Sequence, residues 1–189
     1  MGSLQTALIF LISTLFDLYL FVLIIRLVLA WVRSHYYDPL TQFVVKLTQF
    51  LVNPLRRIIP NIGRLETACL VIIIAFVMIK FFIISMLSFG TVNPLGLFIM
   101  TAADTLRLLI QTFFYAILFQ CILSFVQPQS PINYTLQQFT APIMRPIRRW
   151  IPLIAGIDIS PIPAIIGLQL LLMLIVQPLM MWGAGVSLG

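Results

Sequence analysis

The chain has 189 residues, of which 61% are hydrophobic and 8% are charged, and its formal net charge is +6. Soluble domains carry about 25% charged residues, so this composition excludes a soluble globular protein and predicts an integral membrane protein. In a membrane protein, an excess of Lys and Arg reflects orientation in the bilayer and attraction to anionic lipids, so we expect no direct contact with nucleic acid.

The first predicted membrane span covers residues 5–32. At about 1.5 Å per residue it is longer than the ~30 Å hydrocarbon core, so we expect it to tilt or to protrude. Asp17 lies about midway along this span, and Arg26 lies near its inner end. Charged groups inside membrane spans are costly and are functional candidates by default. Arg26 is close enough to the end to snorkel towards the interface.

A shorter helix is predicted after Pro39, where apolar side chains recur at helical spacing and polar side chains take the opposite side. The apolar positions include Leu40, Val44, Leu47 and Leu51. A proline suits the first turn of a helix, because its missing N–H would have no partner there. This pattern predicts an amphipathic helix, which we expect on the membrane surface; packing against a partner is the alternative.

This helix leads into a segment with paired arginines, Pro54-Leu55-Arg56-Arg57-Ile58-Ile59-Pro60. Arg56 and Arg57 either set the orientation of the chain or form a shaped site for anionic headgroups or an acidic partner. The flanking prolines favour a defined geometry, because proline restricts the backbone. Glu66 follows Arg57 by nine residues, and it either caps the next helix or pairs with Arg57.

The second predicted span covers residues 67–89 and contains Lys80 about midway. Asp17 lies at a similar depth in the first span, which predicts an intramembrane ion pair between these two residues.

A short turn at residues 90–94 precedes the third predicted span, residues 95–126. Asp104 and Arg107 are three residues apart on one face of this helix, so we expect them to pair with each other. The intramembrane charges serve either to orient helices or to line a path for an ion or a proton. Packing is favoured, because the fourth span offers only Gln169 and Gln177 as polar groups of this kind.

The next segment repeats the first at a distance of 92 residues. Pro146-Ile147-Arg148-Arg149-Trp150-Ile151-Pro152 matches the segment that begins at Pro54, and Asp158 matches Glu66. A helix after Pro131 and a fourth span at residues 162–182 complete the second copy. We therefore predict two tandem repeats, residues 1–91 and 92–189. Asp158 either caps the fourth span or pairs with Arg149, nine residues before it.

The positive charges predict the orientation of the chain. Residues 33–66 contain Arg33, Lys46, Arg56, Arg57 and Arg64, and residues 127–161 contain Arg145, Arg148 and Arg149. The termini and the turn at residues 90–94 contain no Lys or Arg, so both long connections are expected in the cytoplasm and both termini in the periplasm. The repeats are then parallel, and two such segments side by side would form a shared basic rim.

No catalytic or metal-binding pattern is present in the sequence. The single histidine, His35, has no second ligand nearby, and Cys69 and Cys121 lie separately in apolar runs. We therefore predict that the protein is not an enzyme and holds no cofactor or metal.

Two copies of a span followed by a Pro-Leu/Ile-Arg-Arg-x-Ile-Pro segment, with an acidic residue before the next span, resemble the YggT (YlmG-like) family. The resemblance covers nearly the whole chain and is most specific at Pro39–Gln49, Pro54–Pro60 and Pro146–Pro152. The copies differ where Gly63-Arg64 becomes Ala155-Gly156, which makes the first copy the more basic one.

The resemblance implies a small inner-membrane protein without catalytic residues. Members of this family are linked to osmotic tolerance and ion uptake, and others to cell division and envelope organisation. Plastid relatives are linked to cytochrome assembly and nucleoid distribution. We therefore expect an all-α protein of four spans that helps organise envelope components. Its expected partners are anionic lipids, an envelope or cell-division protein, or a second copy of itself. A small ion-transporting or ion-regulating protein is the alternative.

Overall fold

The computed structural model describes residues 3–32, 38–57, 59, 65–89, 93–150 and 158–188. The helices are α1 (Ser3–Val32), α2 (Pro39–Arg56), α3 (Thr67–Phe89), α4 (Pro94–Val126), α5 (Pro131–Trp150), α6 (Pro161–Leu171), η1 (Leu172–Val176) and α7 (Gln177–Leu188). The predicted all-α class is confirmed. The predictions that concern Arg33, His35, Pro60, Arg64, Gly90–Val92 and Pro152 lie outside the described residues.

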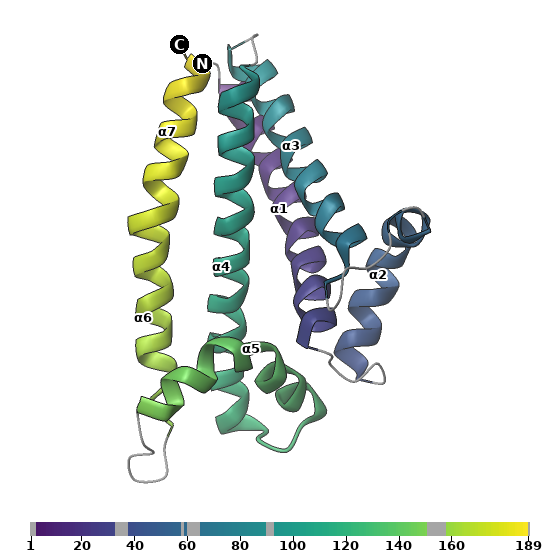
Figure 1. Cartoon of the computed structure of the whole chain (residues 1–189), viewed down its shortest axis with the longest axis vertical. Helices are drawn as coiled ribbons and strands as arrows, with labels where there is room; N and C mark the ends of the chain where they lie inside the picture. The colour runs from purple at the N-terminus through teal and green to yellow at the C-terminus, as the bar shows by residue number, and fades with distance from the viewer. Residues whose placement is uncertain are drawn as a thin grey trace.

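Four helical stretches are long and apolar enough to cross a membrane: residues 3–32, 67–88, 94–126 and 161–186. They agree closely with the four predicted spans. The fourth is continuous through α6, η1 and α7, with a π-helical turn in its middle. The starts of α1 and α4 and the ends of α3 and α7 lie at one end of the molecule, whereas α2 and α5 lie towards the other (Figure 1). Both long connections therefore belong to the same side of the bundle.

Helix α4 occupies the centre of the bundle. It packs against α1 and α3 on one side and against α6 and α7 on the other (Figure 1). Side chains such as Leu23, Ile73 and Ile117 are almost fully buried in the core. Because α1 and α3 belong to the first half of the chain and α4, α6 and α7 to the second, the contacts of α4 join the two halves.

Helix α7 lies close against α4 at Gly183. A Cβ atom added there would lie 2.8 Å from Met100 Cγ and 3.2 Å from the Met100 backbone nitrogen. Gly167, in α6, has no atom within 4 Å of the same position. Glycine therefore lets these two backbones come together, as small residues do between membrane helices.

We expect Gly183→Val to push α7 away from α4 and to lower the free energy of unfolding by about 1–3 kcal/mol, the usual cost of overpacking. Gly167→Val carries the same change in helix propensity without the clash, so it serves as the matched control. Unfolding in mixed detergent micelles measures both. Equal effects of the two substitutions would contradict the close contact at Gly183.

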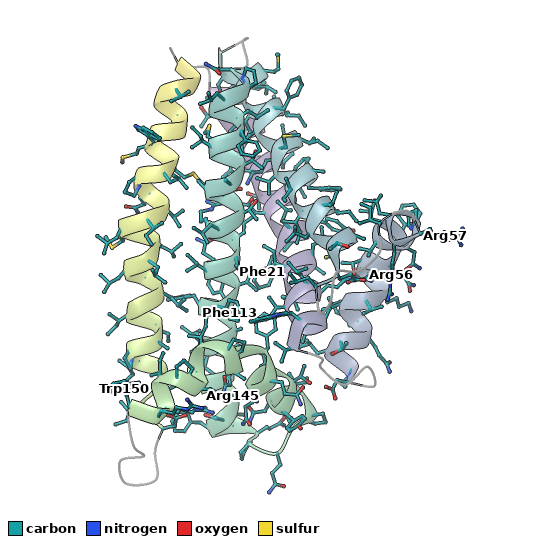
Figure 2. The ribbon with its side chains drawn as sticks, viewed as in Figure 1. Phe21, Arg56, Arg57, Phe113, Arg145 and Trp150 are labelled. Carbon is teal, nitrogen blue, oxygen red and sulfur yellow. The ribbon has the colours of Figure 1, made fainter. Side chains whose placement is uncertain are left out.

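Helices α2 and α5 extend from the lower part of the bundle. Helix α5 crosses beside the lower end of α4, and α2 packs beside the lower end of α1 (Figure 1). Their N-terminal regions are joined by a hydrogen bond of 2.7 Å that the Thr135 hydroxyl donates to Asp38 Oδ2. Their C-terminal ends diverge, with Arg56 and Arg57 at one edge and Arg145 and Trp150 at the other (Figure 2). The expectation of one shared basic rim is therefore wrong, because α2 and α5 point away from each other.

Candidate functional site

Four charged side chains from three membrane-spanning helices form one network, which we call the charge quartet: Asp17, Lys80, Asp104 and Arg107. Lys80 Nζ lies 2.7 Å from Asp17 Oδ1, and it also donates to Asp104 Oδ2. Arg107 Nη2 lies 2.8 Å from Asp17 Oδ2. Arg107 Nε lies 2.7 Å from Asp104 Oδ1, an ion contact in which the N–H is not aligned for a hydrogen bond. Two positive and two negative groups balance each other.

The quartet is closed on one side and open on the other. Asp104 is fully buried and Lys80 nearly so, whereas the side chains of Asp17 and Arg107 are each 31% exposed. The open side adjoins a cavity of about 430 Å³ between α1 and α4. Its lining residues are Thr14, Asp17, Leu18, Phe21, Leu108, Gln111 and Tyr115. The arrangement neutralises charge inside the bundle and leaves one polar edge on its surface.

The predicted contacts between Asp17 and Lys80 and between Asp104 and Arg107 are both present. That the two pairs form a single network was not predicted from the sequence. A signal for it was available in the helix lengths. Lys80 lies nine residues before the end of α3 at Phe89, and Asp104 lies ten residues after the start of α4 at Pro94. Because a short connection joins these antiparallel helices, the two side chains reach the same depth.

A second buried ion pair lies where α1, α2 and the start of α3 meet. Arg26 is 5% exposed, and its Nε and Nη2 each donate to Glu66 at 2.9 Å. Its Nη1 donates to the Thr48 hydroxyl at 2.9 Å. The expectation that Arg26 snorkels outwards is wrong, because α2 packs beside the end of α1 and Glu66 supplies a buried partner.

Glu66 also lies 4.0 Å from Arg56 Nη1, so the predicted partner Arg57 is replaced by Arg26 and Arg56. Helix α2 includes Arg56, and its last turn directs this residue, rather than Arg57, towards the start of α3. In the second half, Asp158 likewise pairs with Arg148 at 2.8 Å instead of Arg149. Both arginine–acid contacts thus join the first arginine of the doublet to an acid ten residues later.

Asp158 has a second role at the start of the fourth span. Its Oδ1 accepts a hydrogen bond of 3.0 Å from the backbone N–H of Ser160, which is the N-cap residue of α6. No side-chain cap hydrogen bond forms at this N-terminus, so Asp158 holds the turn before the helix and pairs with Arg148, but it does not cap the helix. Partial burial acts to raise its pKa, but the hydrogen bonds from Ser160 and the charge of Arg148 outweigh burial and hold the pKa below its usual value. Its stabilising contribution is therefore present above the usual aspartate pKa and is lost as the pH falls through the lowered pKa.

The outer ends of α2 and α5 combine exposed arginines with exposed aromatic residues. Arg56, Arg57, Arg148 and Arg149 are all exposed. Phe50 is 84% exposed near the first doublet, and Trp150 is 87% exposed beside the second. Arg57 and Arg149 form no ion pair with any residue in the described ranges. We call α2 with Arg57, and α5, the two basic arms. An aromatic side chain beside guanidinium groups suits the boundary between hydrocarbon and headgroups.

Little else in the described part of the chain suggests chemistry. Those residues contain no group of three or more His, Cys, Asp or Glu side chains placed to hold a metal. Cys69 is buried with its Sγ 3.4 Å from the Leu23 carbonyl oxygen, and Cys121 is a second free thiol in α4.

Comparison with known proteins finds bacterial relatives that match most of this chain. The chain is 41% identical over 163 residues to an uncharacterized protein in the proC 3' region of Vibrio alginolyticus, which covers 85% of this chain and 88% of that protein. It is 38% identical over 179 residues to the uncharacterized protein YggT of Escherichia coli K12, with 92% of each chain covered. An uncharacterized protein of Haemophilus influenzae is 35% identical over 158 residues, with 83% of each covered. No solved structure matches.

The CCB3/YggT family profile matches this sequence in two stretches, residues 5–87 and 99–179. These stretches cover most of the chain and contain all four charged members of the quartet as well as both arginine doublets. The chain therefore belongs to the CCB3/YggT family.

Proposed function

We propose that this protein is a non-enzymatic, multi-pass protein of the bacterial inner membrane that helps organise or assemble envelope components. In this proposal the basic arms lie on the cytoplasmic surface as amphipathic helices and bind anionic lipid or a partner. The observation that carries it is the pairing of exposed arginines with an exposed aromatic residue at the end of each arm.

The orientation is part of the proposal. The two arms lie towards one end of the bundle (Figure 2). They carry most of the basic residues of the long connections: Lys46, Arg56, Arg57, Arg145, Arg148 and Arg149. Loops rich in Lys and Arg stay in the cytoplasm, so the opposite end, with both termini, faces the periplasm. The exposed rings of Trp31, Trp150 and Trp182 support two interfaces, since Trp favours the headgroup level on both sides of a bilayer.

The tandem arrangement is also proposed. The order of a long helix, a shorter helix and a second long helical stretch occurs in both halves. The contacts Arg56–Glu66 and Arg148–Asp158 are separated by the same 92 residues as the sequence motifs. Two arms on a common side would hold the protein at the membrane surface at two separate points.

The lipid-binding arm is tested with Arg56→Gln/Arg57→Gln. Each arginine near an anionic surface contributes about 1 kcal/mol, so the double change is expected to weaken retention of anionic lipid by about 2 kcal/mol, or ~30-fold. Native mass spectrometry of the purified protein, titrated with phosphatidylglycerol, measures this retention. Arg56→Lys/Arg57→Lys keeps the charge and is the matched control.

A loss of lipid in the lysine variant as large as in the glutamine variant would contradict a role of the arm's positive charge. The wider organising role is tested with a photo-reactive amino acid in place of Trp150 in native membranes. A specific protein adduct that Arg148→Glu abolishes is expected. An unchanged adduct in that variant would contradict partner binding by this arm.

The second candidate is a protein that conducts or regulates ions, linked to osmotic stress. A specific observation favours it: a cavity of about 430 Å³ reaches Asp17 and the open edge of the charge quartet. The net neutrality of the quartet and its buried Lys80–Asp104 pair favour helix packing instead. Liposomes containing the purified protein, under an imposed cation gradient, distinguish the two. Flux abolished by Asp17→Asn would support conduction, and no flux would exclude it.

A further inference from the structure

The face of the bundle between α1 and α4 has an unusual polar edge. Asp17 and Arg107 are each 31% exposed although both lie in membrane-spanning helices. Gln111 is half-buried and Thr14 is exposed beside them. Ionised groups that face lipid are costly, and in membrane proteins they almost always face protein or a water-filled cavity. This edge therefore needs a polar cover that lipid chains do not supply.

A second cavity lies along the same face. It has a volume of about 340 Å³, a lining that is almost wholly apolar, and walls from α1, α2, α4 and α5. Phe21 and Tyr115 line both cavities, and their rings contact edge to face with centroids 6.3 Å apart. Tyr115, Leu118 and Phe119 are exposed beside it. We call the cavity beside Asp17 the polar notch and the second cavity the apolar hollow. The two adjoin on the α1–α4 face, because Phe21 and Tyr115 line both.

The surface formed by α6 and α7 differs from the α1–α4 face. Residues 161–188, which include α6 and α7, contain no Asp, Glu, Lys or Arg. Their exposed side chains include Leu174, Met181 and Trp182. This surface needs no polar cover, so it suits direct contact with lipid.

We propose that the α1–α4 face is the interface of a homodimer, with the two-fold axis parallel to the membrane normal. Two copies inserted in the same orientation can be related by such an axis, and it sets α1 of one copy opposite α4 of the other. Asp17 and Arg107 contact each other, so they lie at the same depth. The axis therefore brings each Asp17 towards Arg107 of the second copy.

The charges of Asp17 and Arg107 favour a second copy of the protein, rather than a lipid chain, as the occupant of the α1–α4 face. A carboxylate on α1 and a guanidinium on α4 form a self-complementary pair across this axis, and the aromatic residues of each copy meet the apolar hollow of the other. A hydrocarbon chain fills the hollow but leaves the exposed edge of the Asp17–Arg107 pair against an apolar surface. The proposal does not depend on lipid binding by the basic arms.

Disulfide cross-linking of the full chain in membranes tests the interface. Cys69→Ala/Cys121→Ala provides the background. Leu18→Cys is placed in one tagged copy and Tyr115→Cys in a differently tagged copy, so that only contact between copies joins the two tags. We expect a disulfide-linked pair under mild oxidation, and at least ten times less product when Met181→Cys replaces either site.

A bulky residue in the notch provides the second measurement. Gln111→Trp fills the cavity and is expected to reduce the cross-linked product at least tenfold, whereas Gln169→Trp, on the exposed face of α6, leaves it unchanged. Native mass spectrometry in mild detergent is expected to show a dimer that Gln111→Trp converts to monomer. The proposal would be overturned by absence of the cross-link or by equal cross-linking through Met181→Cys. A native mass spectrum that shows only a monomer with bound lipid would also overturn it.

Discussion

Replacing Lys80 with methionine is expected to be among the most destabilising single changes in this protein. Lys80→Met leaves Asp104, which is fully buried, with only the misaligned contact from Arg107. Breaking a buried ion pair by removing one partner costs about 3–5 kcal/mol, because the remaining charge loses its compensation. Unfolding of the purified protein in mixed detergent micelles measures the loss.

The double variant Lys80→Met/Asp104→Leu is the decisive comparison. It removes both buried charges and leaves the 2.8 Å pair of Asp17 and Arg107 in place. Replacing a buried ion pair with apolar side chains is often neutral, so most of the lost stability is expected to return. Lys46→Met, on the exposed side of α2, controls for loss of a lysine and should change stability by about 0.5 kcal/mol or less. A double variant as unstable as Lys80→Met would show that Asp104 is not the source of the cost.

Replacing Arg26 with methionine is expected to have the second largest effect. Glu66 would keep only the distant Arg56, 4.0 Å away, as a positive neighbour. Three hydrogen bonds from Arg26 would also be lost, two to Glu66 and one to Thr48. Because the pair is buried, we again expect a loss of about 3–5 kcal/mol in the free energy of unfolding.

The second half of the chain supplies the matched control for Arg26. Arg148 and Asp158 form a pair at 2.8 Å, but their side chains are partly exposed to solvent. Exposed pairs contribute about 0–1 kcal/mol, so Arg148→Met should cost far less than Arg26→Met. The same unfolding titration compares the two. Equal losses would mean that burial does not set the energy of these arginine–acid pairs.

The spans could be predicted well because they depend on local composition. Each predicted span begins and ends within a few residues of its helix, apart from the fourth, which extends from Pro161 to Leu188. The predicted end of that span at Trp182 preceded the small residues Gly183-Ala184-Gly185, which lower hydropathy but continue the helix against α4. Packing with Met100 overrides the low helix propensity of glycine there.

The partners of the charged residues were harder to predict. The Asp17–Lys80 contact followed from matching depths in two neighbouring spans. Arg26 was expected to reach the interface, because nothing in the sequence shows that Glu66, 40 residues away, covers it. Spacing along the chain favoured Arg57 and Arg149 as partners of the acids, whereas the last turns of α2 and α5 place Arg56 and Arg148 there.

The sequence by itself determined the helical class, the number of spans, the start of each arm at a proline and the recurrence of the arginine doublets. These properties follow from hydropathy, helical period and charge, which are local and are read against the fixed thickness of a bilayer. Only the tertiary structure decided that four charges meet in one quartet, that Arg26 is buried, and that the two arms diverge. Those outcomes depend on which helix faces adjoin and how the helices cross, and spacing along one chain does not specify either.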